Sequence, residues 1–315
     1  MKHFVVILAA LGIAAAINTG SVAAQDKQST NSNTDNAPAQ FSSDVTRVNM
    51  LFTVTDRRGR FITDLNRDDF EIFENKKPQE ISEFTSESDL PLRLAILVDT
   101  SNSIRDRFRF QQEAAVNFIN GVMRDQDKAT VVSFDSSAEL VADLTSDTAK
   151  LENAIRELRP GGGTALYDAI YFACRDKLMH DQPLYKFRRA MVILSDGEDN
   201  NSRLSRDQAL EIAQKADVVV YTISTNTSRQ ETEGDKIMHY FADQTGGLAF
   251  FPFQASELNQ SFENIANELR HQYNLFYRPT PLKNDGQFHA VQIRVRGRKD
   301  LIVRARKGYY ARRVG

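Results

Sequence analysis

The sequence has very few of the residues on which several common kinds of chemistry depend. Of its 315 residues, only one is cysteine, five are histidine and none is tryptophan. The single cysteine, Cys174, excludes an intramolecular disulfide, so the fold must be stabilised by its core. Lys and Arg number 40 against 42 Asp and Glu, a net charge of −2. No excess of positive charge therefore favours nucleic acid, and we expect no nucleic-acid partner.

The N-terminus has the three-part layout of a secretory signal peptide. A lysine near the start precedes an apolar run over residues 4–17, and small residues at 21–24 offer a cleavage site. The run is shorter than the ~20 residues that span a bilayer. This favours a signal peptide at 1–24 over an uncleaved membrane anchor. We expect an exported protein, periplasmic or secreted, with no transmembrane segment after cleavage. Residues 25–42 are polar and predict a disordered linker.

Two segments with strand-like patterns flank the middle of the chain, at 43–90 and 272–315. Apolar residues alternate with others at 48–55 and 291–295, and shorter strands are expected at 70–74, 81–84 and 301–306. Residues 75–78 are predicted to form a turn. Because two or three strands are marginally stable without a partner layer, we expect both segments to build one small β-sandwich-like domain.

Between these flanks, at 91–271, buried strands alternate with helices. Residues 93–99 are almost continuously apolar, as in a strand covered on both faces of a parallel sheet. Further strands are expected at 129–134, 140–144, 190–195, 218–224 and 248–253, and helices at 104–122, 148–158, 165–179, 206–215, 235–244 and 255–270. This order predicts a doubly wound, mostly parallel six-stranded α/β sheet of the Rossmann-like kind, inserted in the β-rich domain.

Carboxylate and hydroxyl side chains follow the ends of two of these strands. Asp99, Ser101 and Ser103 stand two residues apart, Thr164 follows three glycines, and Asp196 follows the strand at 190–195. Ligand sites of open α/β sheets lie beyond the carboxyl ends of strands where the strand order reverses, and we expect both strands to meet there. Hard oxygen donors suit Mg²⁺, with Mn²⁺ or Ca²⁺ as alternatives. Two carboxylates and three hydroxyls leave about one octahedral position for a partner's Asp or Glu.

Each of these residues also has a simpler interpretation. Asp99 could cap the following helix, Thr164 could cap the next one, and Asp196 could only begin a turn. Together on one sheet edge, however, they favour a metal site. Glu198 and Asp199, which extend the acidic run, are interpreted as solvated loop charges that influence which partners are tolerated.

The pattern Asp-x-Ser-x-Ser from Asp99, followed by Thr164 and by Asp196 with a glycine after it, resembles the metal-ion-dependent adhesion site (MIDAS) of von Willebrand factor A (VWA) domains. The resemblance covers about residues 93–271. It implies that Ser101, Ser103 and Thr164 bind the metal directly, while Asp99 and Asp196 often act through water. Short motifs in the flanks, including Arg-Lys-Gly-Tyr-Tyr at 306–310, resemble a bacterial group in which this domain is framed by β-rich segments.

The function expected from these features is that of an adhesion or protein-binding module, which captures a partner carboxylate through the divalent cation. The alternative is a structural envelope protein in which the metal only stabilises the fold. The five histidines are scattered, and neither a zinc-type His pair nor a phosphate-binding Gly-Lys-Ser/Thr loop occurs in the sequence. We therefore expect no catalysis. The sequence indicates no oligomeric state.

Many Arg and Lys residues gather in the last 22 positions of the chain, from Arg294 to Arg313. They fit a basic patch for an anionic polymer or lipid headgroups. They equally fit a solvated strand face whose charges deter edge-to-edge pairing, which is the interpretation we favour.

Overall fold

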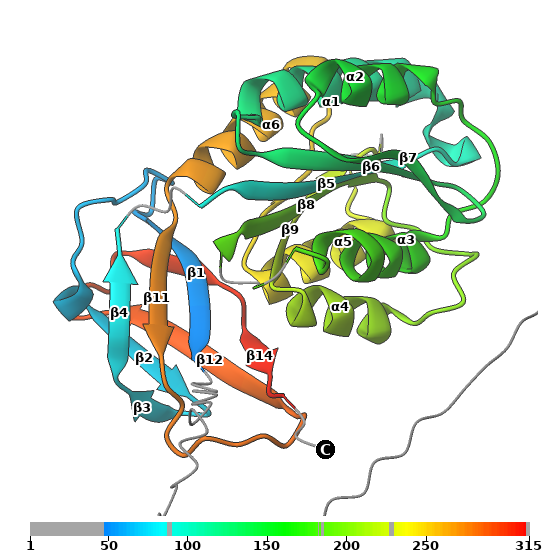
Figure 1. Cartoon of the computed structure of the whole chain (residues 1–315). Coiled ribbons are helices and arrows are strands. Elements are labelled where there is room, and N and C mark those ends of the chain that lie inside the picture. The colour runs from blue at the N-terminus through cyan, green and yellow to red at the C-terminus, as the bar shows by residue number, and fades with distance from the viewer. Residues whose placement is uncertain (1–46, 87–89, 182, 184–185, 227–229, 313–315) are drawn as a thin grey trace, which may run out of the picture. The chain divides into compact units, whose positions relative to one another are not determined.

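Three β-sheets, one mixed and two antiparallel, organise the computed structural model of the chain (Figure 1). The predicted signal peptide at 1–24 and linker at 25–42 lie outside the described residues. The described residues belong to one compact unit. They are 47–86, 90–181, 183, 186–226 and 230–312.

The mixed sheet has the strand order β10-β9-β8-β5-β6-β7, in which only the edge strand β7 is antiparallel to its neighbour. All eight residues of β5 are buried, which explains the continuous apolar run, since helices cover both faces of the sheet. The strands are β5 (Leu92–Asp99), β6 (Lys128–Phe134), β7 (Ala138–Thr145), β8 (Arg188–Ser195), β9 (Val218–Ser224) and β10 (Ala249–Phe250).

Helices α1, α2 and α6 cover one face of this sheet, and α3, α4 and α5 cover the other (Figure 1). Leu94 and Ile96 of β5 point to the first face, Ala95 and Leu97 to the second. This is the doubly wound arrangement that the sequence predicts. The helices are α1 (Phe108–Val122), α2 (Thr148–Glu157), α3 (Leu166–Ala173), α4 (Arg206–Lys215), α5 (Glu233–Thr245) and α6 (Ala255–Arg270), with short helices η2 (Asn102–Arg107) and η3 (Cys174–Leu178).

The two antiparallel sheets each combine strands from both ends of the chain, and their orders are β13-β1-β11-β4 and β14-β12-β2-β3. Phe52 and Phe70, one from each sheet, pack edge to face with ring centroids 5.1 Å apart. The predicted β-sandwich-like arrangement is therefore confirmed, and we name it the β lobe, beside the α/β lobe. Its elements are β1 (Val48–Thr55), η1 (Arg67–Asp69), β2 (Phe70–Glu74), β3 (Lys77–Gln79), β4 (Ile81–Thr85), β11 (Tyr273–Tyr277), β12 (Phe288–Val295), β13 (Ile302–Ala305) and β14 (Gly308–Tyr310). The boundaries that the sequence suggests between the segments 43–90, 91–271 and 272–315 stay predictions.

The turn predicted at 75–78 is shorter in the structure. Asn75 and Lys76 have φ values of 47° and 68°, and β3 begins at the next residue. Two consecutive positive φ values are the geometry of a tight two-residue hairpin turn. Pro78 lies in β3, an edge strand, where its missing amide hydrogen costs no hydrogen bond.

Other element boundaries also differ from the sequence-based expectations. The strand expected at 248–253 ends at Phe250. It cannot continue because Pro252 has no amide hydrogen to donate, and because the carbonyls of Pro252 (3.0 Å) and Phe253 (2.6 Å) accept hydrogen bonds from the Arg107 guanidinium instead. The helix expected at 165–179 is α-helical only to Ala173 and continues as the π-helical turn η3. Strands β11 and β14 were not predicted.

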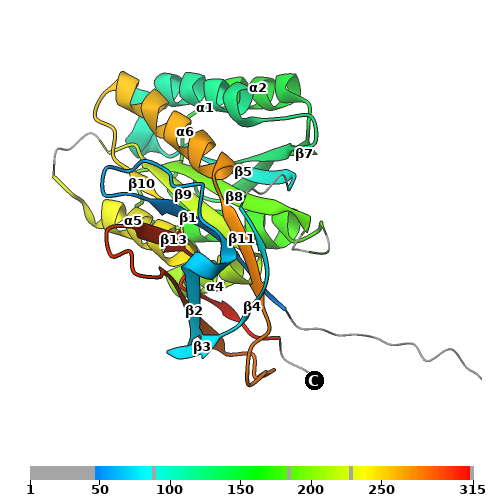
Figure 2. The same cartoon turned by 90° about the vertical axis from the view of Figure 1, so that its left-hand side faces the viewer.

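Strand β1 is buried on both faces, although its period-two pattern is typical of a strand with one exposed face. Its second face meets the α/β lobe, where Thr53 Oγ1 donates to Glu268 Oε1 at 3.0 Å. Glu268, on α6, also pairs with Arg304 of β13 at 3.3 Å, and its burial raises the pKa of its carboxyl. Helix α6, which leads into β11 (Figure 2), is thus bound to two further strands of the β lobe.

The basic residues near the C-terminus are largely paired with carboxylates. Arg306 pairs with Asp217 and Lys307 with Asp243, both at 2.9 Å, and these two bridges join the β lobe to the α/β lobe. This pairing argues against a basic surface patch. The further pairs in this segment are Arg296–Glu71 and Arg298–Asp300.

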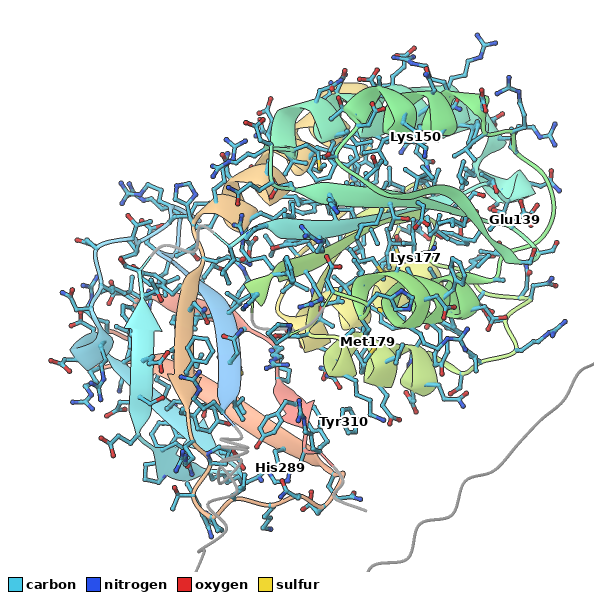
Figure 3. All side chains as sticks on the ribbon, in the orientation of Figure 1. Glu139, Lys150, Lys177, Met179, His289 and Tyr310 are labelled. Atoms are coloured by element: carbon cyan, nitrogen blue, oxygen red, sulfur yellow. The ribbon has the colours of Figure 1, made fainter. Side chains whose placement is uncertain are left out.

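The motif at 306–310 continues this attachment through its two tyrosines. Tyr309 donates its hydroxyl to Glu74 Oε2 at 3.2 Å, and His289 Nδ1 lies 2.7 Å from the other oxygen of that buried carboxylate. Tyr310, the last residue of β14, contacts α4, where the Lys215 ammonium stands 5.3 Å from the centre of its ring (Figure 3). The motif therefore fastens the end of the chain to both lobes.

The contact between the lobes predicts unequal effects of two glycine substitutions. Gly246 (φ +85°) and Gly59 (φ +78°) both have left-handed backbone, but a Cβ on Gly246 would lie 2.5 Å from backbone atoms of Ala305 and Arg306, whereas Gly59 has open space. Gly59→Ala should lower the free energy of unfolding by about 1–2 kcal/mol. Gly246→Ala should lower it by a further ~1–3 kcal/mol, because the lobes must separate. Urea unfolding measures both, and equal losses would show that the lobes do not press together here.

Candidate metal centre

The candidate site lies where the order of the mixed sheet reverses. Strands β5 and β8 pair in parallel from Leu92 to Val98, and β6 and β7 extend the sheet on one side of them while β9 and β10 extend it on the other. Asp99 is the last residue of β5, and Asp196 directly follows β8. The prediction that these two strands lie side by side is confirmed by their register, and this edge is where ligand sites form in such sheets.

Asp99, Ser101 and Ser103 form one hydrogen-bonded chain with Ser195. Asp99 is fully buried, and its two carboxylate oxygens accept from Ser101 N at 2.8 Å and from Ser195 Oγ at 2.6 Å. The hydroxyls of Ser101 and Ser103 lie 2.9 Å apart. The loop therefore gathers a carboxylate and two hydroxyls, as the spacing predicts.

The structure does not support the simpler interpretation that the side chains of Asp99 and Thr164 serve only as helix caps. Ser101 occupies the N-cap position of η2, and Ala165 that of α3, but neither cap has a side-chain hydrogen bond to its helix. Asp99 and Thr164 stand outside the cap positions of those two helices. The hydroxyls of Ser101 and Thr164 are therefore not used for capping.

The glycine-rich loop at 161–164 is joined by its backbone to the other two loops. Gly161 N donates to Thr100 O at 2.6 Å, on the side of the first loop. On the opposite side, Thr164 N donates to Asn200 Oδ1 at 2.9 Å, and Thr164 O accepts from the amides of Asn200 and Asn201, both at 3.0 Å. The buried Thr164 is thus held between the loops that carry Asp99 and Asp196.

Gly162 allows the glycine-rich loop to lie close to Asp135, in the loop that follows β6. Its φ is +79°, and an added Cβ would lie 2.8 Å from Asp135 Oδ2. Gly197 is constrained in the same way, since its φ is +80° and a Cβ would lie 2.2 Å from Gly234 O. Both loops of the site therefore depend on glycine at positions where other residues are strained.

Asp196 is partly buried and accepts from Glu198 N at 3.1 Å. Burial raises the pKa of Asp99 to about 6, although its hydrogen bonds with Ser195 and Ser101 lower it, and the negative charge of Asp196 raises it further. The charge of Asp196 therefore opposes the ionisation of Asp99. A divalent cation near them would relieve that cost.

Sequence reasoning missed two residues that build the site. Ser195 is not among the predicted site residues, yet its hydroxyl is the link between β8 and Asp99. Asp199, interpreted as a solvated charge, accepts from the amide of Tyr167 at 3.0 Å and from the hydroxyl of Ser202 at 2.6 Å. Asp199 thus fixes the loop that carries Asp196, which is the third loop of the site, onto α3. Glu198 is exposed, in agreement with its interpretation.

The donor set is chemically suited to a hard cation. All five predicted ligands offer oxygen, which Mg²⁺ prefers. In the part of the chain that the structure describes, no three His, Cys, Asp or Glu side chains gather as a metal site. A cation held here would therefore depend on the hydroxyls of Ser101, Ser103 and Thr164 as well as on the carboxylates of Asp99 and Asp196.

Asp99 predicts a specific pH dependence of the metal-free protein. Because its folded pKa of about 6 lies above the ordinary 3.8, the native state binds more protons than the unfolded state between these values, and stability falls as the pH rises. The loss from pH 4 to pH 7 should be about 2.4 kcal/mol relative to Asp99→Asn, which cannot ionise. Urea unfolding of both proteins in chelator, at several pH values, measures the difference. Parallel stability profiles would contradict it.

Comparison with known proteins places these residues in a family. Residues 94–198 match the family model of the von Willebrand factor type A domain, and the match includes all five predicted ligands. An uncharacterized protein of Borreliella burgdorferi is 29% identical over 148 residues, which is 44% of this chain and 41% of the relative. The chain therefore spans less than half of the length of that relative.

A solved structure shares the fold of this chain. A von Willebrand factor type A protein from Catenulispora acidiphila aligns with a TM-score of 0.51 and 15% identity over 78% of this chain and 73% of that one, a likeness of fold alone. Proximal thread matrix protein 1 from the mussel byssus, with a zinc-occupied MIDAS motif, aligns with a TM-score of 0.48, 19% identity, and 61% and 48% coverage. BatB from Bacteroides thetaiotaomicron has a TM-score of 0.44, 18% identity, and 56% and 98% coverage. On the family match and its fold, this chain contains a von Willebrand factor type A domain.

Proposed function

We propose that this chain is an exported protein-binding module that captures a partner's carboxylate through a divalent cation held by Asp99, Ser101, Ser103, Thr164 and Asp196. The observation that carries the proposal is the meeting of three separate loops at the switch point of the sheet. In that meeting the hydroxyls of Ser101 and Thr164 are left unused by helix capping. The VWA domain supports a role in protein binding.

The cation proposed for the site is Mg²⁺, with Mn²⁺ or Ca²⁺ as alternatives, since all the donors are hard oxygens. Two carboxylates and three hydroxyls fill five positions and leave about one of an octahedral shell. An Asp or Glu of the partner suits that position by charge and by donor type. The exposed Glu198 on the third loop would disfavour partners with further negative charge nearby.

A catalytic role is less well supported. Ser195 Oγ donates its proton to the buried carboxylate of Asp99 at 2.6 Å, so the hydroxyl is engaged as a structural link. Although the carboxylate stands where a base for a serine nucleophile would stand, Ser195 is fully buried, so no substrate reaches its hydroxyl. We expect no turnover at this site.

Export is proposed from the N-terminal sequence layout alone. Within the described residues no helix is both long enough and apolar enough to cross a membrane. The second candidate function, a structural envelope protein whose metal only stabilises the fold, is favoured by the full burial of Asp99. A cation would lower the cost of that buried charge whether or not a partner binds.

Metal binding predicts a rise in melting temperature. At a free Mg²⁺ concentration of about 100 times its Kd, binding should add about 2.7 kcal/mol of stability. Ser103→Ala removes an exposed predicted ligand and should abolish most of this gain, whereas Glu198→Gln removes an exposed charge of the third loop and should keep it. Scanning calorimetry with Mg²⁺ or with chelator measures the shift. An equal shift in wild type and Ser103→Ala would place the metal elsewhere.

Partner capture separates the two candidate functions. Immobilised wild-type protein should retain a defined protein from the native envelope in Mg²⁺ and release it in chelator. Asp99→Ala should not retain it, because the buried carboxylate that orders the first loop is lost. Glu198→Gln serves as the control that keeps capture. Retention unchanged in excess chelator would reject the metal-dependent mechanism, and a thermal shift without any metal-dependent partner would favour the structural role.

A further inference from the structure

A cluster of ionisable side chains is buried in the β lobe. Glu74 of β2 and His289 of β12 are 5% and 3% exposed, and His289 Nδ1 lies 2.7 Å from Glu74 Oε1. The other carboxylate oxygen, Oε2, accepts from the hydroxyls of Tyr277 on β11 at 2.7 Å and Tyr309 on β14 at 3.2 Å. His289 Nε2 lies 3.1 Å from Asp285 Oδ1. The cluster therefore joins the two sheets of the β lobe.

The contacts of His289 determine how many protons the cluster holds. Hydrogen bonds from Gln287 N and from His289 lower the pKa of Asp285, so its carboxylate is ionised and the contact with Nε2 requires a hydrogen on that nitrogen. Without a second proton, His289 Nδ1 and Glu74 Oε1 would be two acceptors facing each other at 2.7 Å. A proton therefore lies between these two atoms, on one or the other of them.

The same cluster holds β14 in place. Tyr309 is the register partner of His289 across β14 and β12, and their ring centroids lie 5.4 Å apart. Gly308 approaches β12 so closely that an added Cβ would lie 2.1 Å from His289 O. The next residue, Tyr310, contacts α4 of the α/β lobe beside Lys215 (Figure 3). Loss of the shared proton would therefore act on a strand that joins the two lobes.

The surrounding charges set the pH range in which that proton is lost. Burial lowers the pKa of His289, but its hydrogen bonds with Glu74 and Asp285 and their negative charges outweigh burial and raise the pKa above 6.5. Burial and the contact with Glu74 raise the pKa of both tyrosines, and the positive charge of Arg306 offsets that rise only in part. The tyrosine hydroxyls therefore keep their protons when His289 loses its own.

We propose that Glu74 and His289 form a pH-sensitive latch, which holds the C-terminal strand β14 while a proton lies between them and releases it at alkaline pH. Without the proton, two buried acceptors are in contact and the Glu74 carboxylate has lost a donor, which is costly in a buried place. Because the folded state binds this proton more tightly than the unfolded chain, the latch stabilises the fold fully below pH 6.5. Its contribution is lost as the pH rises through the folded pKa of His289.

Glu74→Gln is expected to keep the latch closed at every pH. The amide nitrogen of the glutamine side chain can donate to Nδ1 of neutral His289, while its oxygen accepts from the two tyrosine hydroxyls. All contacts of the cluster are then made without a proton that titrates. Glu71→Gln is the matched control, because it makes the same substitution on the same strand at a partly exposed residue outside the cluster.

Hydrogen exchange of the Ala311 amide measures the attachment of the strand. This amide donates to Gln287 O at 3.0 Å, directly after β14. From about pH 6 to about pH 9, its protection relative to the intrinsic exchange rate should fall about tenfold in the wild type and in Glu71→Gln, the cost of one unpaired buried group. In Glu74→Gln the protection should stay constant.

NMR titration follows the proton itself. The imidazole resonance of His289, assigned by its absence in His289→Gln, should titrate with a midpoint above pH 6.5 in the wild type and at least about one pH unit lower in Glu74→Gln. A wild-type midpoint at or below 6.5 would overturn the proposal. So would protection of Ala311 that is constant in the wild type, or that falls equally in Glu74→Gln. All measurements are made in chelator, so they test the latch independently of the proposed metal.

Discussion

The hydrogen bond from the Ser195 hydroxyl to the Asp99 carboxylate supports much of the remaining architecture of the candidate site. It joins the ends of β5 and β8 at 2.6 Å, between which the strand order reverses. Asp99 has no exposed surface, and a buried carboxylate is costly unless its oxygens accept hydrogen bonds. The backbone carbonyl of Ser195 also accepts from Thr225 N, so the same residue connects the metal loops to the segment that follows β9.

Polar contacts also join the two lobes. Salt bridges from Arg304, Arg306 and Lys307 and a close backbone approach at Gly246 hold the β lobe against helices of the α/β lobe. Salt bridges of this kind depend on the correct placement of their charged groups and not only on the surface area buried between the lobes. They join the C-terminal strands to α6, the helix that closes the α/β lobe, so both ends of the chain contribute to one unit.

Much of the fold followed from simple periodicity. The apolar run of β5 predicted a strand covered on both faces, and the sheet confirms it. Because carboxyl ends of parallel strands share an edge, the positions of Asp99 and Asp196 predicted a common site, and the pairing of β5 with β8 confirms that their strands meet. Elements whose form depends on distant partners were not predictable. Strand β1 is covered on its second face by Glu268 and its neighbours, more than 200 positions away.

The same distinction holds for single residues of the site. The sequence by itself determined the donor types, the two-residue spacing of Asp99, Ser101 and Ser103, and the order of the loops, because these depend on local chemistry and on strand direction. Only the tertiary structure decided that Asp199 fastens a loop to α3 and that Ser195 links two strands. Hydrogen bonds and cavities form between segments whose separation along the chain carries no information about their distance in space.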